Sequence, residues 1–187
     1  MELSKEEIRA QIKARRAGLD AAWVRETSER IACRVVARPE FAAASVVGAY
    51  LAMAPEVQTE AILRACWSAG KRVCVPALDR TQGGYDLAWM TRDSAVSKGP
   101  FGVAELVSPA WVAADQPIDL LLVPGVGFDR AGGRVGHGRG YYDRILTARA
   151  AHLRCRLGLA FEFQVFPRVP MTASDVRMDV VMTQHEA

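Results

Sequence analysis

Gly125-Val-Gly-Phe-Asp-Arg-Ala-Gly-Gly-Arg-Val-Gly-His-Gly-Arg-Gly140 separates an apolar run over residues 118–124 from a helix expected to begin at Tyr141. A glycine-rich connection that follows a strand and opens a helix is typical of α/β sheets, in which ligands bind at the carboxyl ends of the strands. The segment holds seven of the chain's 15 glycines. Because that density costs conformational entropy on folding, we expect the segment to use its accessible backbone for binding.

Helices and strands are expected to alternate on either side of this segment. Ser4 and Glu7 form a capping-box pattern that predicts a helix, and Asp20 is placed to cap a second one. A third helix is expected from Thr59 to about residue 70. Apolar or alternating runs predict strands over residues 45–52, 73–76, 85–90, 118–124, 157–161 and 180–183. We therefore predict an α/β fold, a single layered, Rossmann-like domain over residues 1–187 with a largely parallel central sheet flanked by helices.

The composition is that of an ordinary globular protein. The 187 residues are 50% hydrophobic and 24% charged, which allows a sizeable core and excludes a disordered chain. The longest uncharged run, residues 41–55, is shorter than the roughly 20 residues that span a bilayer, and the acidic N-terminus does not resemble a targeting signal. The four cysteines form no C-x-x-C pair, which favours reduced thiols. We expect a cytoplasmic protein with no membrane association.

Three arginines, Arg130, Arg134 and Arg139, are interleaved with the glycines. Glycine backbone can direct several N–H groups at an anion, arginine adds charge-assisted hydrogen bonds, and the N-terminus of the following helix favours a phosphate. The segment matches neither G-x-x-x-x-G-K-[ST] nor G-x-G-x-x-G, so its spacing alone names no nucleotide-binding family. It therefore predicts a phosphate cradle, with a mobile surface loop as the alternative.

Asp143 is expected in the first turn of the helix that follows this cradle. A nucleotide-bound magnesium ion takes one or two carboxylates together with phosphate oxygens, which makes Asp143 a candidate ligand. The alternative is that Asp143 only complements the helix dipole. A second carboxylate could come from Asp175 or Asp179, between which sequence spacing does not choose.

The first helix carries four basic residues at helical spacing, Lys5, Arg9, Lys13 and Arg16. One or two of them could reach an anion, or all four could form a solvated face that Glu6 and Glu7 partly neutralise. The net charge of +3 is too small to predict nucleic-acid binding.

Four segments together resemble a known family. Residues Leu122 to Arg144, LVPGVGFDRAGGRVGHGRGYYDR, resemble the signature of the 5-formyltetrahydrofolate cyclo-ligase (5,10-methenyltetrahydrofolate synthetase) family. Lys5-x-x-x-Arg9 resembles its nucleotide-contacting pair, residues 50–59 resemble its folate-contacting segment, and Asp175-Val-Arg-Met-Asp179 resembles its closing motif. The resemblance covers nearly the whole chain, in the expected order.

The resemblance implies a ligase that converts 5-formyltetrahydrofolate to 5,10-methenyltetrahydrofolate, with ATP as co-substrate and Mg²⁺ as cofactor, and releases ADP and phosphate. In the family's mechanism the formyl oxygen takes the γ-phosphoryl group before N10 attacks, so the protein positions its substrates and stabilises charge. We accordingly expect a cytoplasmic, monomeric enzyme of one-carbon metabolism. Its partners are ATP and the folate, with or without a polyglutamate tail, and include neither nucleic acid nor membrane.

The resemblance also assigns residues, each by its match to the family's motifs. The catalytic residues are Arg134 and Asp143, and the metal ligands are Asp143 and Asp179. The ATP-binding residues are Lys5, Arg9, Arg134, Gly136, Gly138, Gly140 and Tyr142. The substrate-binding residues are Leu51, Glu56, His137, Gly138, Arg139, Gly140 and Tyr141. Glu56 would accept hydrogen bonds from the N–H groups of the pterin ring.

Two residues depart from the family pattern. The position of His137 is often Tyr or Arg in the family, and that of Arg139 is often Gly or Lys. A histidine at this position would affect substrate affinity and pH dependence. Arg139 could contact a polyglutamate tail.

Two other readings remain open. A different phosphate-binding α/β enzyme, such as a sugar-phosphate isomerase, would also need an anion cradle, but it would not need ATP. A non-enzymatic RNA-binding domain could use the basic first helix, and its affinity would depend steeply on salt.

Overall fold

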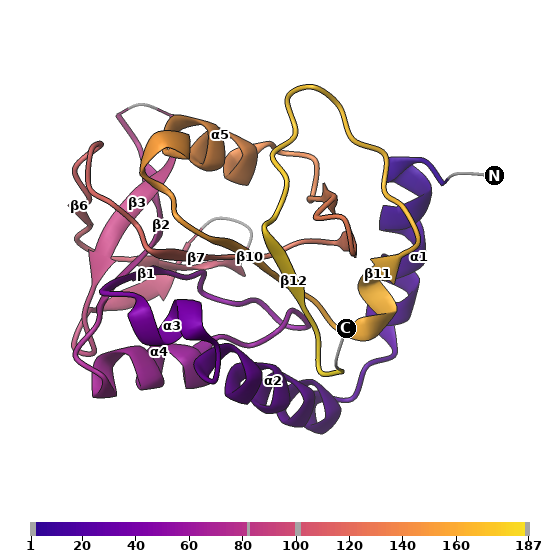
Figure 1. The fold of residues 1–187 in the computed structure, drawn as a ribbon, viewed down its shortest axis with the longest axis horizontal. Helices are drawn as coiled ribbons and strands as arrows, with labels where there is room; N and C mark the ends of the chain where they lie inside the picture. Colours follow the sequence, from indigo (N-terminus) through magenta and orange to yellow (C-terminus); the bar gives the residue numbers. More distant parts are fainter. Residues whose placement is uncertain (1–2, 82, 100–101, 186–187) are drawn as a thin grey trace.

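The computed structural model describes residues 3–81, 83–99 and 102–185 of the chain (Figure 1). The helices are α1 (Lys5–Ala17), α2 (Ala21–Val36), α3 (Pro39–Ala43), α4 (Glu60–Ser68) and α5 (Tyr141–Ala148), with short 3-10 turns η2 (Ala150–His152) and η3 (Glu162–Gln164). The strands are β1 (Val46–Gly48), β2 (Arg72–Asp79), β3 (Gly84–Met90), β4 (Val96–Lys98), β5 (Ala104–Leu106), β6 (Ala110–Trp111), β7 (Leu120–Val123), β8 (Gly127–Asp129), β9 (Arg134–Val135), β10 (Arg156–Leu159), β11 (Val165–Phe166) and β12 (Val180–Met182). Within the described ranges, no helix combines the length and apolar character needed to cross a bilayer.

The central sheet has the order β12-β10-β7-β1-β2-β3-β6. The pairs from β12 to β2 are parallel, whereas β3 and β6 are antiparallel to their neighbours. Helices α2, α3 and α4 cover one face of this sheet and α5 lies over the other (Figure 1). The mixed α/β fold with a largely parallel, helix-flanked sheet is thus confirmed. Strand β7 is central and parallel to its neighbours β1 and β10. The glycine-rich segment that follows β7 therefore leaves the sheet at the carboxyl ends of these strands.

The first helix lies away from the central sheet. The Ser4–Glu7 capping box fixes its start, and its apolar stripe, Ile8 and Ile12, is fully buried. This stripe faces β8 and β9, which together with β11 form a small second sheet. Helix α1 therefore lies against the glycine-rich segment, to which Arg9 and Arg16 donate hydrogen bonds.

The glycine-rich segment is more ordered than the connecting loop expected from its composition. Strands β8 and β9 form a hairpin inside it, and the buried carboxylate of Asp129 holds the turn by accepting the N–H groups of Ala131, Gly133 and Val169 at 2.8–3.0 Å. Gly132 has a φ of +84° and packs against the backbone of Met178, which leaves no space for a side chain. Residues 127–135 therefore form a largely buried hairpin rather than a surface loop.

The strand expected over residues 45–52 is shorter than predicted. Beyond β1 the chain turns away, because the Tyr50 hydroxyl donates to the carbonyl of Val57 at 2.9 Å and the Thr59 hydroxyl donates to the carbonyl of Tyr50 at 2.5 Å. These bonds close residues 50–59 into a compact loop beside the carboxyl end of β1. The loop carries Glu56 to the same side of the sheet as the glycine-rich segment.

Arg149 anchors the end of α5 to the edge of the central sheet. Its buried guanidinium donates to both carboxylate oxygens of Asp86 at 2.9 Å and to the carbonyls of Val112 and Ala113. Arg149→Ala is expected to lower the free energy of unfolding by about 2–3 kcal/mol, because buried carbonyls lose their donor. This corresponds to a fall in melting temperature of roughly 5–10 °C, measurable by calorimetry. The melting temperature of Arg149→Lys should lie between those of wild type and Arg149→Ala. An unchanged melting temperature in Arg149→Ala would contradict this role.

Candidate active site

A cavity of about 510 Å³ opens at the carboxyl ends of β1 and β7. It brings together the glycine-rich segment, the start of α5, the N-terminal helix and the 50–59 loop. The expected site residues that line it are Lys5, Arg9, Leu51, Glu56, Arg134, Gly136, His137, Gly138, Arg139, Gly140, Tyr141, Tyr142 and Asp143. Asp179 is absent from this lining.

Arg134 and Asp143 form the buried centre of the cavity wall. The guanidinium of Arg134, whose side chain is 4% exposed, donates to Asp143 Oδ1 at 2.5 Å and to the carbonyl of Pro124 at 3.3 Å. A side chain at Gly136 would meet Arg134 Nη1 at 3.0 Å, so this glycine permits the close approach of the backbone. The Asp143 side chain is 32% exposed, which leaves part of its carboxylate accessible to a ligand.

Two of the four basic residues of α1 reach the cavity. Lys5 Nζ pairs with Asp175 Oδ2 at 2.5 Å, and Arg9 Nε donates to the carbonyl of Gly136 at 2.9 Å. Burial opposes the charge on Asp175, but the hydrogen bonds from Lys5 and Thr172 outweigh it and lower the pKa of Asp175. Lys5 and Arg9 thus belong to the cavity rather than to a purely solvated face.

The other two basic residues of α1 lie elsewhere. Lys13 is exposed, and half-buried Arg16 donates to the carbonyl of Gly125 at 3.1 Å. Burial lowers the pKa of Arg16, and the negative charge of Glu56 partly offsets this. Arg16 therefore supports the start of the glycine-rich segment from outside the cavity lining.

Another part of the cavity lining is built around Glu56. Its side chain is only 9% exposed, its Oε2 accepts the N–H of Met53 at 3.1 Å, and its Oε1 lies 3.4 Å from His137 Nε2. Leu51 and Pro76 add apolar surface to the same cavity lining. A buried carboxylate framed by apolar surface suits a ligand with N–H donors and flat hydrophobic rings.

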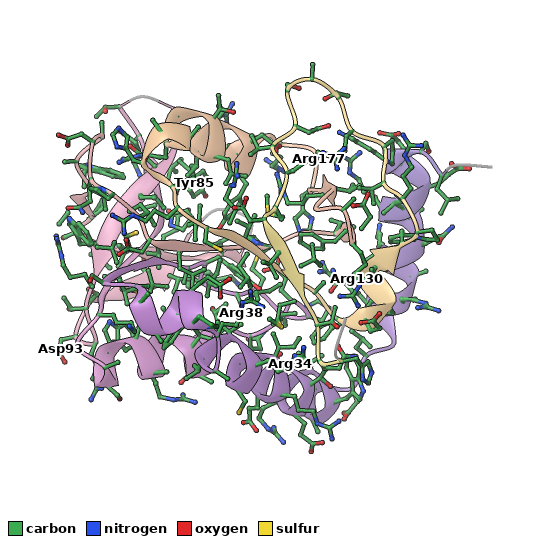
Figure 2. All side chains as sticks on the ribbon, viewed as in Figure 1. Arg34, Arg38, Tyr85, Asp93, Arg130 and Arg177 are labelled. Carbon is green, nitrogen blue, oxygen red and sulfur yellow. The ribbon has the colours of Figure 1, made fainter. Side chains whose placement is uncertain are left out.

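Tyr85 is a cavity residue that sequence reasoning missed, and its hydrogen-bond partner Glu105 lies outside the cavity lining. Tyr85 lies beside α5 (Figure 2), with its ring centroid 4.7 Å from that of Tyr141, and its hydroxyl donates to buried Glu105 at 2.7 Å. Burial and the hydrogen bond to Glu105 raise the pKa of Tyr85. Glu105 sits on the β4–β5 hairpin, which was not predicted because strands this short leave little periodicity in the sequence.

Asp179 occupies the opposite edge of the central sheet, just before β12. Its carboxylate accepts the backbone N–H of Arg156 at 2.7 Å and two guanidinium nitrogens of the same residue at 2.8 and 2.7 Å. The hydrogen bond from Arg156 lowers the pKa of Asp179. The structure therefore does not bring Asp143 and Asp179 together, which corrects the expected pair of metal ligands. Asp175, the other carboxylate left open by the sequence, does line the cavity.

Asp179→Asn is expected to weaken the fold and leave the reaction intact. Because the folded pKa of Asp179 is lowered, its ion pair stabilises the protein above the unfolded value of about 3.8, and the contribution is lost as the pH falls through the folded pKa. At pH 7 the half-exposed pair should contribute about 1 kcal/mol, or roughly 2–4 °C in melting temperature. Turnover should stay within threefold of wild type. A large loss of turnover at an unchanged melting temperature would instead support a role for Asp179 in the active site.

A family model described as the 5-formyltetrahydrofolate cyclo-ligase family matches residues 1–184. The chain belongs to this family. A mouse 5-formyltetrahydrofolate cyclo-ligase is 27% identical over 188 residues, covering 96% of this chain and 93% of the relative. The Escherichia coli K12 cyclo-ligase is 27% identical over 176 residues, covering 92% and 96%. The enzyme class expected from the sequence, a ligase, agrees with the names of these cyclo-ligase relatives.

Two solved structures are similar to the fold of this chain. The solution structure of Aquifex aeolicus 5,10-methenyltetrahydrofolate synthetase has a TM-score of 0.80 at 28% identity, covering 97% of this chain and 90% of that one. The Mycoplasma pneumoniae 5,10-methenyltetrahydrofolate synthetase has a TM-score of 0.75 at 20% identity, covering 98% of this chain and all of that one. This second likeness supports the fold alone.

Proposed function

We propose that this member of the cyclo-ligase family converts 5-formyltetrahydrofolate to 5,10-methenyltetrahydrofolate while ATP is cleaved to ADP and phosphate. The observation that carries the proposal is that one cavity joins a cationic, glycine-lined half to a half built on a buried carboxylate. Such a cavity suits two chemically different ligands that must be held together in order to react. Its volume of about 510 Å³ lies within the usual range for small-molecule sites.

The nucleotide phosphates would occupy the cationic half. Arg134 offers a fixed guanidinium, Lys5 and Arg9 add charge from α1, and the backbone from Gly136 to Gly140 lies against the N-terminus of α5. Gly138 and Gly140 have φ values of +89° and +66°, conformations that glycine adopts without strain. Backbone N–H groups, a helix N-terminus and arginine are the usual components of a phosphate site.

The folate would occupy the half around Glu56. The carboxylate would accept N–H donors of the pterin ring, and Leu51 and Tyr141 would contact its faces. His137 would lie next to the pterin because it already contacts Glu56. Arg139, on the same cavity wall, would reach towards a polyglutamate tail.

The reaction would require positioning and charge stabilisation rather than an enzyme nucleophile. A formyl group on nitrogen is an amide and a poor electrophile, so its oxygen first takes the γ-phosphoryl group. N10 then attacks the activated carbon and phosphate leaves. Arg134 would hold the transferring group and offset its charge, as expected for phosphoryl transfer.

The donor set suits a magnesium ion that arrives with the nucleotide. Asp143 offers a partly accessible carboxylate beside the proposed phosphate site, and Asp175 lies on the same wall, engaged by Lys5. Across residues 3–81, 83–99 and 102–185, no three metal-binding side chains cluster, which agrees with an ion that takes most of its ligands from phosphate and water. When bound there, Mg²⁺ would neutralise phosphate charge.

The test is an absorbance assay for the methenyl product with purified protein, 5-formyltetrahydrofolate, ATP and Mg²⁺. Product should form only in the complete mixture and not when any single component is omitted. Turnover of a sugar phosphate without ATP would favour the isomerase reading instead. Tight, steeply salt-dependent binding of RNA with no turnover would favour the RNA-binding reading.

A further inference from the structure

Tyr85 lines the cavity from β3 and has a partner on each of two neighbouring elements. Its ring contacts that of Tyr141 at the start of α5, with centroids 4.7 Å apart and planes tilted by 57°. Its hydroxyl donates to Oε1 of Glu105 on β5 at 2.7 Å. One half-buried side chain thus connects three elements that border the cavity, β3, α5 and the β4–β5 hairpin.

The Tyr141 ring, which also lines the cavity, depends on side-chain packing for its place. Gly140, the residue before α5, supplies no side-chain cap, so the first turn of the helix lacks the hydrogen bond that a capping residue would provide. The ring instead contacts Tyr85, and the guanidinium carbon of Arg144 lies 5.1 Å from its centroid. Such contacts fix the orientation of an aromatic ring. Removing the Tyr85 ring would therefore free Tyr141 to turn within the cavity.

The β4–β5 hairpin is held beside the cavity through Glu105. The hairpin forms a two-stranded sheet of its own, and its residues Val103 and Ala104 line the cavity. Glu105 is only 7% exposed, and a side chain at Gly99 would clash with its carboxylate, so this glycine leaves the space that the carboxylate occupies. A buried carboxylate without its donor is unfavourable. The Tyr85 hydroxyl therefore helps to fix Val103 and Ala104 in the cavity lining.

The lining beside Tyr85 suits flat rings better than phosphate. Pro76 lies on the same face of the β2–β3 pair as Tyr85, because Tyr85 is opposite Leu78, two residues further along β2. Pro76, Val103, Ala104 and Tyr141 all line the cavity and carry no charge. Apolar and aromatic side chains of this kind commonly line the sites of flat organic ligands. The cations proposed to hold the phosphates come instead from α1 and β9.

We propose that Tyr85 is a positioning residue for the folate, which acts by holding the Tyr141 ring and the β4–β5 hairpin where they contact the flat rings of the substrate. This inference rests on the proposed function, which places Tyr141 against the folate. Neither Tyr85 nor Glu105 belongs to the segments by which the sequence resembles the cyclo-ligase family. The inference makes Tyr85 a determinant of folate affinity and gives it no part in holding the nucleotide.

Two substitutions of Tyr85 separate its two contacts. Tyr85→Phe removes the hydroxyl and keeps the ring, whereas Tyr85→Leu removes both. By calorimetry without ATP, the Kd for 5-formyltetrahydrofolate should rise about 3- to 5-fold in Tyr85→Phe and about 10- to 30-fold in Tyr85→Leu. In the methenyl assay, KM for the folate should rise by similar factors, with KM for ATP within twofold and kcat within threefold of wild type.

Substitutions of Glu105 test the hydrogen bond from its other end. Glu105→Ala should weaken folate binding as much as Tyr85→Phe does. Glu105→Gln should stay within twofold of wild type, because its amide oxygen can accept the same bond. The double variant should bind the folate no more weakly than either Tyr85→Phe or Glu105→Ala, since both changes break one bond. Additive losses would contradict the role of the hairpin.

Trp89→Leu is the matched control for a purely structural effect. Trp89 is an aromatic residue of the same strand that packs against the core and against Arg72, and it lies outside the cavity lining. Its loss should lower the melting temperature and leave the Kd for the folate within twofold of wild type.

The remaining outcomes distinguish this inference from the proposed function. An unchanged Kd for the folate in Tyr85→Leu would overturn the inference alone. So would a rise confined to KM for ATP, or equal rises in both KM values with a melting temperature lowered as in Trp89→Leu. Wild-type protein that binds the folate without forming product would overturn the proposed function, and the comparison of Kd values would still decide the role of Tyr85. Wild-type protein that does not bind the folate would overturn both.

Discussion

Arg134→Ala is expected to lower kcat by about 10³-fold while KM for 5-formyltetrahydrofolate changes less than threefold. The wild-type guanidinium is 4% exposed and fixed by Asp143 and the carbonyl of Pro124, so under the proposed function it would meet the phosphoryl group without reorganisation. Because the side chain is buried, its charge would be little screened by water, which would strengthen its effect on the transition state. Steady-state kinetics with each substrate varied in turn would measure both parameters.

Arg134→Lys is the matched control for this prediction. It keeps the positive charge but loses the planar fork that bonds Asp143 and Pro124 simultaneously, so its kcat should lie between those of the alanine variant and wild type. Circular dichroism should show that both variants fold. An effect confined to KM for the folate would contradict the placement of Arg134 beside the phosphates.

Asp143→Asn is expected to lower kcat by about 10²-fold and to raise the Mg²⁺ concentration that gives half-maximal activity by at least tenfold. Asparagine keeps an oxygen that can accept the bond from Arg134, so the position of the guanidinium should be preserved. The change removes the negative charge that a hard cation prefers. Activity titrated with Mg²⁺ at saturating ATP would measure the effect.

The form of the loss in Asp143→Asn distinguishes two roles for the carboxylate. If Asp143 only orients Arg134, kcat falls and the Mg²⁺ concentration for half-maximal activity stays at the wild-type value. If Asp143 also holds the ion, that Mg²⁺ concentration rises. Near-normal activity at saturating ATP and ordinary Mg²⁺ concentrations would remove Asp143 from both roles.

Local signals in the sequence were sufficient for much of the fold. The capping box at Ser4 and the cap at Asp20 act within one helical turn, and both are present in the structure. The apolar run of β7 forms a central strand, and the helix after Gly140 begins at Tyr141 as predicted. These features depend on neighbouring residues, which is why patterning could find them.

Features that depend on contacts distant in sequence were not predictable. Asp179 was matched to a metal site, but pairing of β10 with β12 places it beside Arg156. The β8–β9 hairpin depends on Asp129 receiving the N–H of Val169, 40 residues away. The contact between Tyr85 and Glu105 joins two strands of different sheets. In each case a hydrogen bond between residues distant in sequence determines where the side chain lies, and local sequence patterns do not predict such a bond.

The pairing of Lys5 with Asp175 spans 170 positions of the chain. During synthesis Lys5 emerges from the ribosome long before Asp175, so this ion pair forms only after the chain between them has been made. Truncations that remove either residue are accordingly expected to open the cavity wall that both line.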